Sequence, residues 1–119
     1  MSARSVLVTG TDTGIGKTHS SVALLHALRT TGLRAVGMKP IASGCDWIDG
    51  RWRNEDALAL QAASDPRPDY ADINPVALPE PTAPTLAAIA AGVTVDIAKL
   101  YAAHARLASK ADVVLVEGA

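Results

Sequence analysis

The sequence has 119 residues, 49% of them apolar, and its 11 basic and 12 acidic residues leave a net charge of −1. This size suits one domain, or part of one, with a buried core. The charge balance argues against a nucleic-acid-binding surface, which needs a basic field to neutralise phosphates. No apolar run approaches the ~18 residues of a membrane span, and the start shows no secretory signal pattern. We therefore expect a cytoplasmic protein that binds neither nucleic acid nor membrane.

The first third of the chain predicts a strand–helix–strand unit. Residues 5–9 are a short run rich in β-branched residues that stops at a glycine, which indicates a buried strand. Residues 17–31 have helical periodicity, and Gly32 suits the position just after a helix end. Residues 34–39 predict a second strand, which Pro40 ends. Such a unit implies parallel strands joined by a right-handed crossover, and we expect the two strands to be neighbours.

The middle of the chain is less regular. Residues 41–53 contain two glycines and two tryptophans without a clear period, and we interpret them as a loop. Asn54 is a good N-cap for a short helix over 55–63. Six of the seven prolines lie in 65–85, which excludes a long helix there. Within it, 73–78 can form a strand only at a sheet edge or with an irregular hydrogen-bond ladder, because it contains a proline.

The last third predicts two helices and a strand. A proline opens a short helix over 84–92. A longer helix over 95–109 has one apolar stripe, formed by Ile97, Leu100, Tyr101, His104 and Leu107. On that stripe, His104 is expected to be packed rather than catalytic. Residues 112–117 then form an apolar strand that ends almost with the chain. One face of this last strand should be uncovered, so we expect a fragment truncated after Ala119.

The strongest local signal is a glycine-rich segment between the first strand and the first helix: Gly10-Thr11-Asp12-Thr13-Gly14-Ile15-Gly16-Lys17-Thr18. Glycines let backbone N–H groups approach a phosphate, and the helix N-terminus adds partial positive charge. Lys17 would reach the terminal phosphates, and the Thr18 hydroxyl would bind Mg²⁺. The strict phosphate-loop pattern has four residues between its glycines, whereas five lie between Gly10 and Gly16. An ordinary turn that caps a helix is the alternative, and the strand–loop–helix context favours the phosphate loop.

These elements together predict an α/β fold like that of P-loop NTPases. We expect a doubly wound, mostly parallel sheet with helices on both faces. Residues 1–119 would form the N-terminal part of one such domain.

Two more charged residues are candidates for the same site. Glu117 ends an apolar strand, and ligands of open α/β sheets bind just beyond such strand ends, where a carboxylate can hold the nucleotide's Mg²⁺. Lys39 ends the strand expected beside the phosphate-loop strand, so its ammonium should project toward the same mouth. An exposed strand terminus and a surface lysine are the respective alternatives. The helix dipole alone accounts for Asp56 in the first turn of its helix.

Five segments, in order and at matching spacing, resemble the N-terminal half of dethiobiotin synthetases. They are the phosphate loop with its extra residue, Lys39-Pro40-Ile41-Ala42-Ser43-Gly44, Arg53-Asn54-Glu55-Asp56-Ala57-Leu58, the proline-rich Asn74-Pro75 with Glu80-Pro81-Thr82-Ala83-Pro84, and Val116-Glu117-Gly118-Ala119. The resemblance covers essentially the whole chain. In that family, Val-Glu-Gly-Ala is followed by two further glycines.

The resemblance implies an ATP-dependent ligase of biotin biosynthesis, with Mg²⁺ as cofactor and ATP as co-substrate. One amine of 7,8-diaminononanoate would capture CO2, supplied as CO2 or bicarbonate, and form a carbamate. The carbamate would attack the γ-phosphate, and the second amine would then close the ring. A homodimer is expected for the full-length protein, with the second half supplying the remaining strands and the adenine contacts. The 119-residue chain alone should bind ATP weakly and not turn over.

The resemblance also implies roles for individual residues. The two catalytic lysines would be Lys39 and Lys17. Substrate contacts would come from Thr13, Lys39 and Ser43. Metal contacts would come from Thr18, Asp56 and Glu117. Nucleotide contacts would come from Gly14, Ile15, Gly16, Lys17, Thr18, His19, Asp56, Glu117, Gly118 and Ala119. Several family members carry a glutamate where Gly14 stands, so the role of that carboxylate is missing here.

Three other interpretations compete. A non-catalytic nucleotide switch of the partitioning-ATPase type usually has an extra lysine early in the phosphate loop, and Thr11, Asp12 and Thr13 offer none. An amide ligase that activates carboxylates is not expected to combine Lys39-Pro40 with Ser43-Gly44. In the third interpretation, the fragment is incomplete and binds nothing. The single cysteine, Cys45, argues against a disulfide or zinc cluster, and no activating base is evident for it.

Overall fold

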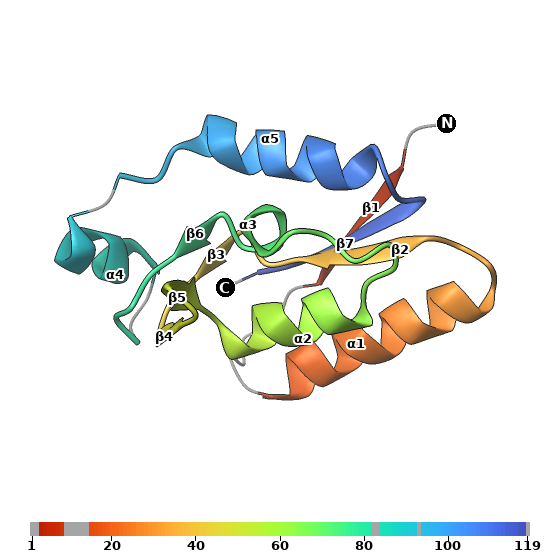
Figure 1. Cartoon of the computed structure of the whole chain (residues 1–119), viewed down its shortest axis with the longest axis horizontal. Coiled ribbons are helices and arrows are strands. Elements are labelled where there is room, and N and C mark those ends of the chain that lie inside the picture. Colours follow the sequence, from red (N-terminus) through yellow and green to blue (C-terminus); the bar gives the residue numbers. More distant parts are fainter. Residues whose placement is uncertain (1–2, 9–14, 82–83, 93, 119) are drawn as a thin grey trace.

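A computed structural model describes residues 3–8, 15–81, 84–92 and 94–118, and its centre is a three-stranded parallel sheet (Figure 1). The strands are β1 (Arg4–Val8), β2 (Ala35–Met38) and β7 (Val113–Glu117). Their order is β1-β7-β2, and Val114 aligns with both Ser5 and Val36. The expected pairing of the first two strands is therefore wrong. The crossover through the first helix skips one position, which the near-continuously apolar β7 fills.

Helices cover both faces of this sheet. One face carries α1 (Ile15–Thr30) and α2 (Glu55–Ala63), and the other carries α5 (Ile97–Ala108). Successive β7 side chains alternate between the two faces, as a strand requires. Leu115 packs in one core cluster with Leu25 and Leu60, whereas Val114 packs in another with Ala103 and Leu107. The prediction of a doubly wound α/β arrangement is confirmed.

The segment between β2 and α2 is more ordered than predicted. It contains β3 (Ile41–Ala42) and a hairpin of β4 (Asp46–Ile48) and β5 (Arg51–Arg53), so the prediction of a plain loop is wrong. Asp49 and Gly50 join the hairpin strands with positive φ values of 50° and 82°. Both values suit the Asp-Gly turn that matches the twist of a two-residue hairpin. That dipeptide was the sequence signal for the hairpin.

The proline-rich segment adds three short elements: α3 (Tyr70–Ile73), β6 (Val76–Ala77) and α4 (Pro84–Ala91). The strand expected within 73–78 is reduced to β6, which pairs in parallel with β3 outside the main sheet. The helix predicted at Asn54 is confirmed, since the Asn54 side chain accepts a hydrogen bond from the Ala57 N–H at 3.0 Å. Among the described residues, no helix has the length and apolar character needed to cross a membrane.

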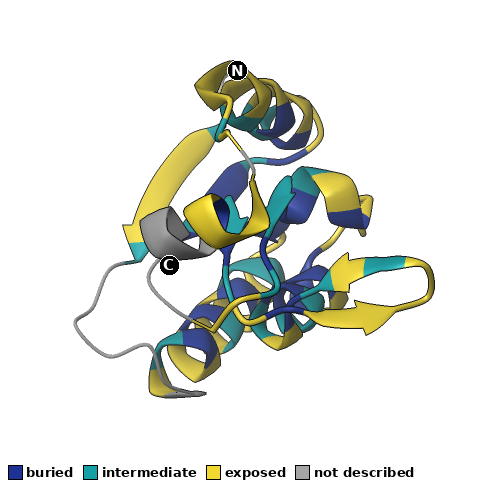
Figure 2. Ribbon diagram, turned by 90° about the vertical axis from the view of Figure 1, so that its left-hand side faces the viewer, coloured by how far each residue is buried: buried dark blue, intermediate teal, exposed yellow. Residues whose placement is uncertain are grey.

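The uncovered strand is β1 and not the last strand. β7 is buried at Val113, Val114, Leu115 and Glu117, because helices cover both its faces. By contrast, the edge strand β1 is exposed, with Leu7 at 67% exposure (Figure 2, yellow). The expectation that one face of the final strand lies open is therefore wrong. The stripe on α5 is only partly buried, since Leu107 lies in the core while Tyr101 is 73% exposed.

Candidate active site

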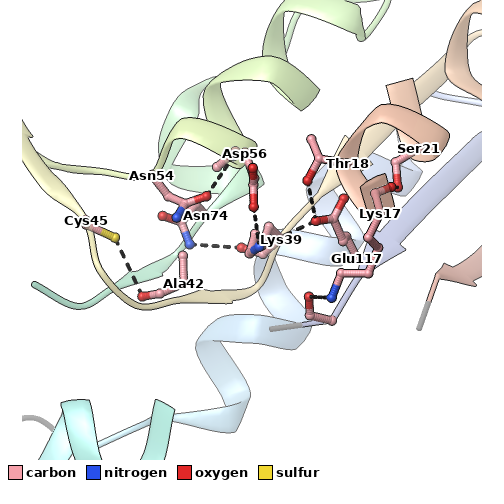
Figure 3. A network of polar contacts seen from close by, with 12 residues as sticks. Lys17, Thr18, Ser21, Lys39, Ala42, Cys45, Asn54, Asp56, Asn74 and Glu117 are labelled. Atoms are coloured by element: carbon pink, nitrogen blue, oxygen red, sulfur yellow. Dashed lines mark hydrogen bonds and ion pairs between the residues drawn. The ribbon is translucent and has the colours of Figure 1, made fainter. Parts of the chain in front are cut away.

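Charged and hydroxyl side chains converge at the carboxyl ends of β2 and β7 (Figure 3). Lys39 directly follows β2, and Glu117 is the last residue of β7. Lys17 and Thr18 come from the first turn of α1, and Asp56 comes from the first turn of α2. The strand order places the central β7 between the phosphate-loop strand and β2. Lys39 therefore reaches the site from the far side of β7, although its strand does not neighbour β1.

Lys39 lies between two carboxylates. Its Nζ is 3.0 Å from Asp56 Oδ2 and 3.4 Å from Glu117 Oε1, and only 9% of its side chain is exposed. A lysine taken out of water in this way requires opposite charge close by, because an unpaired buried charge is costly. The interpretation of Lys39 as a surface lysine is therefore wrong. Asp56, whose sequence position alone gave no reason for a site role, becomes the partner that helps to hold this ammonium.

Glu117 is fully buried, which excludes its alternative as an exposed strand end. Its Oε1 accepts a hydrogen bond from the Thr18 hydroxyl at 2.8 Å and also faces Lys39. Its Oε2 is buried and has no hydrogen-bond partner among the described residues. A buried, unpartnered carboxylate oxygen is rare in folded proteins and calls for a cation or donor.

This donor set fits Mg²⁺, which prefers hard oxygen ligands and keeps several waters and phosphate oxygens. Thr18, Asp56 and Glu117 supply one hydroxyl and two carboxylates, and the free Oε2 is the atom best suited to a cation. The part of the chain that the structure describes holds no group of three or more His, Cys, Asp and Glu side chains able to bind a metal by themselves. The remaining ligands would therefore have to come from the nucleotide and water.

Lys17 crosses from α1 to the end of the central strand. Its Nζ donates a hydrogen bond to the Gly118 carbonyl at 2.9 Å. The Gly118 N–H in turn donates to the Val8 carbonyl at 3.1 Å, which ties the end of β7 to the strand that leads into the phosphate loop. Lys17 thus lies at the mouth between these two strands, as its expected phosphate role requires.

Thr18 and His19 border a hollow of about 360 Å³ between α1 and α2, which Glu55 and Asp56 line from the other side. His19 itself is exposed.

Of the other predicted residues, the structure describes some and leaves others out. Ile15 and Gly16 form the start of α1. Ser43 is half-buried after β3, and within the described ranges no hydrogen bond joins it to the lysine–carboxylate cluster. Thr13, Gly14 and Ala119 lie outside the residues that the structure describes.

Two buried polar residues behind the site, Tyr70 and Asn74, were missed by the sequence reasoning. Asn74 is fully buried and Tyr70 is 5% exposed. Burial raises the pKa of the Tyr70 phenol, so the hydroxyl keeps its proton. The sequence signals were the i, i+4 spacing of Tyr70 and Asn74 and the Asn74-Pro75 pair of the family resemblance, and neither indicates what these side chains contact. A local pattern does not reveal that the Asn74 side chain donates a hydrogen bond to the Lys39 carbonyl, 35 residues away.

Cys45 is buried directly before β4, and its Sγ lies 3.6 Å from the Ala42 carbonyl. Burial raises the pKa of its thiol. A thiol whose pKa is raised is mostly protonated at neutral pH and is therefore a poor nucleophile.

A family model described as an AAA domain matches residues 4–119. This chain belongs to the AAA domain family. Membership confirms the predicted P-loop α/β fold, together with the parallel sheet and the helices on both of its faces.

Within the AAA domain family, the chain is similar to curated proteins named "ATP-dependent dethiobiotin synthetase BioD". The protein from Xanthomonas axonopodis pv. citri is 66% identical over 111 residues, which cover 93% of this chain and 50% of the relative. The protein from Xylella fastidiosa strain 9a5c is 64% identical over 118 residues, which cover 99% of this chain and 52% of the relative. The chain therefore spans about half the length of the curated relatives it matches. The resemblance to dethiobiotin synthetases that the motifs indicated is confirmed.

Proposed function

We propose that the protein containing this chain is an ATP-dependent dethiobiotin synthetase, and that this chain supplies its phosphate-binding and lysine–carboxylate half. The observation that carries the proposal is the convergence of Lys17, Lys39 and the buried Glu117 at one end of the sheet. The relatives' printed name and their high identity across almost the whole chain support the same activity.

The proposed reaction has three balanced steps. One amine of 7,8-diaminononanoate attacks CO2 and loses a proton, which leaves a carbamate. A carbamate oxygen attacks the γ-phosphorus of ATP, and ADP leaves, which gives a carbamic-phosphoric anhydride. The second amine then attacks the anhydride carbonyl and loses a proton, and inorganic phosphate leaves as the five-membered urea ring closes.

The carbamate and the γ-phosphate that it attacks in the second step are both anions, and this repulsion explains the two lysines. Lys39, held at 3.0 Å from Asp56, is a cation close to the phosphate mouth and would pair with the carbamate. Lys17 would pair with the phosphates. Catalysis of this kind depends on positioning and charge stabilisation rather than on a protein nucleophile.

Thr18, Asp56 and Glu117 would hold Mg²⁺, which would supply further charge neutralisation at the phosphates. The unpartnered Oε2 of the buried Glu117 supports this assignment. Ser43 and Thr13 would hydrogen-bond the carbamate or the substrate. The backbone of residues 14–19, and residues 118–119, which follow β7 in the sequence, would contact the nucleotide. A cytoplasmic homodimer, in which the partner subunit helps to hold the substrate carboxylate, completes the proposal.

The test is phosphate release from MgATP by the full-length protein, with and without diaminononanoate and bicarbonate. We expect release that requires both compounds and that falls by at least about 100-fold in Lys39→Ala. Lys99→Ala removes an exposed lysine of α5 and serves as the matched control. Release that is indifferent to both compounds would instead indicate a nucleotide switch and would overturn the proposal.

A further inference from the structure

We propose that Tyr70 and Asn74 are positioning residues, which hold the backbone of Lys39 and the first turn of α2 in one fixed arrangement. The inference rests on the proposed function, because it assigns these two residues a role in placing Lys39 beside Asp56. Among the described residues, no hydrogen bond joins either side chain to the Lys39 ammonium or to the two carboxylates, so each would act through the backbone groups that it holds.

Asn74 holds the Lys39 side of the site. Its Nδ2 donates a hydrogen bond to the Lys39 carbonyl at 2.9 Å (Figure 3). It also donates to the Val76 carbonyl at 3.0 Å. Its Oδ1 accepts from the Tyr70 hydroxyl at 2.8 Å. Only this orientation of the amide satisfies all three contacts, because two of the partners are carbonyl oxygens.

Backbone bonds brace the same segment. The Lys39 N–H donates to the Ile73 carbonyl at 2.8 Å, and the Val76 N–H donates to the Pro40 carbonyl at 3.1 Å. Residues 73–76 are therefore hydrogen-bonded to the chain on either side of the Lys39 carbonyl. The Asn74 amide bonds to that carbonyl itself, between these two backbone bonds.

Tyr70 connects Asn74 to the first turn of α2, which carries Asp56. Its hydroxyl accepts a hydrogen bond from the Asn54 N–H at 2.7 Å while it donates to Asn74. Asn54 is the N-cap of α2, and its side chain accepts from the Ala57 N–H. Asp56 stands between Asn54 and Ala57 in that first turn. The chain of bonds thus runs from the Lys39 carbonyl through two side chains to the helix turn that carries Asp56.

The surroundings of Tyr70 keep this link fixed. The guanidinium groups of Arg51 and Arg53 lie 4.9 Å and 5.0 Å from the centre of the Tyr70 ring. The β4–β5 hairpin therefore packs against the tyrosine that braces the site. A buried network in which every member is satisfied specifies one geometry more strictly than apolar packing does. A displacement of reacting groups by about 1 Å can cost about 100-fold in rate.

The decisive variant is Tyr70→Phe, which removes one oxygen and leaves the ring in place. Tyr101→Phe makes the same change on an exposed tyrosine and is the matched control. In the full-length protein we expect Tyr70→Phe to lower kcat by about 10- to 100-fold, with KM values for MgATP and diaminononanoate within about 3-fold of the parent. Circular dichroism and thermal unfolding check that the variant is folded.

A second readout does not depend on activity. Trace acetylation of native lysines, followed by peptide mass spectrometry, reports how firmly the Lys39 ammonium is held. We expect Lys39 to react several-fold faster in Tyr70→Phe than in the parent, while Lys99 is unchanged. If Tyr70→Phe does not fold, Asn74→Ser removes the bond to the Lys39 carbonyl, and both readouts apply to that variant.

The outcomes separate the two proposals. Faster Lys39 labelling in a protein that never makes the ring product would support the positioning network and contradict the proposed function. A folded variant with unchanged Lys39 labelling would overturn the positioning role, even if kcat fell. A folded variant whose KM rose at unchanged kcat would also overturn the positioning role, because a displaced Lys39 ammonium should lower kcat.

Discussion

The two faces of the central sheet are covered to different degrees. On the face of α1 and α2, the side chains of Leu25, Leu60 and Leu115 are fully buried in one cluster. On the face of α5, a hollow of about 620 Å³ lies between the helix and the sheet, bordered by Met38, Pro40, Leu100 and Val116.

This difference matters for the site because α1 and α2 carry Thr18 and Asp56. The face covered by α1 and α2 is the closed face, and it fixes the two helices whose first turns meet Glu117. The face covered by α5, which contains the hollow, is the open face, and α5 contributes nothing to the lysine–carboxylate cluster described above. We infer that changes in the closed face alter both stability and the site. Changes at the border of the hollow should alter neither by much, whereas Leu107 and Val114 are buried on the same face and belong to the core.

The largest expected effect is that of Leu60→Ala in the closed face. Leu60 is fully buried against α1 and β2, so its truncation leaves a cavity and should lower the free energy of unfolding by about 2–5 kcal/mol. Leu100→Ala, at the partly exposed border of the open hollow, is the control and should cost about 1 kcal/mol or less. Urea unfolding of both variants measures the contrast, and equal losses would refute it.

A smaller loss is expected from Ser64→Ala, at the end of α2. The buried Ser64 hydroxyl accepts from the Gly37 N–H at 2.8 Å and donates to the Leu60 carbonyl at 2.6 Å. The substitution leaves a strand N–H of β2 buried without a partner, which should lower the free energy of unfolding by about 1–3 kcal/mol. Hydrogen exchange at the Gly37 amide should become faster. An unchanged exchange rate would show that another group satisfies this amide.

Alkaline pH should also weaken the chain. The pKa values of Cys45 and Tyr70 are raised above their ordinary values of 9.0 and 10.0, chiefly by burial. The unfolded state therefore loses these protons at lower pH than the folded state. Their contribution to stability is complete below the ordinary values and is lost as pH rises through the raised ones.

Urea unfolding at about pH 8 and about pH 10.5 measures this loss. Cys45→Ala should remove the thiol's share of the decrease, and an identical decrease in that variant would contradict the assignment. The buried thiol should also resist alkylation at about pH 8 until the chain is unfolded.

The smallest effect is expected from Arg106→Ala on the open face. Arg106 Nε lies 2.7 Å from Asp72 Oδ1, but 55% of the arginine side chain is exposed. An ion pair so open to water contributes only about 0–1 kcal/mol. We expect a thermal unfolding midpoint close to that of the parent and an even smaller difference at high salt. A loss as large as that of Ser64→Ala would show that α5 is more tightly coupled to the fold than its open face implies.

The sequence predicted those features that local chemistry determines. Asn54 marked the start of α2 because its side chain caps the helix, and Lys17, Thr18 and Glu117 could be placed from the strand–loop–helix context. The position of β7 between β1 and β2 could not be predicted, because strand order depends on contacts between distant segments. For the same reason the exposed strand was assigned to the wrong end of the chain.

Other features required contacts that no local pattern contains. Asp56 became a candidate only through the family resemblance, and the structure supplies the physical reason, an ion pair with Lys39. Tyr70 and Asn74 act on groups up to 35 residues away. The β4–β5 hairpin is a different kind of omission, because its Asp49-Gly50 turn was visible in the sequence.

We propose that the full-length protein joins CO2 to a diamine in a reaction that consumes ATP. The most direct measurement supplies the full-length protein with ¹³C-bicarbonate, MgATP and diaminononanoate and follows the product by mass spectrometry. We expect one labelled carbon in each ring formed, one ADP for each ring, and loss of both in Lys39→Ala. ADP formation with no labelled ring product would contradict it.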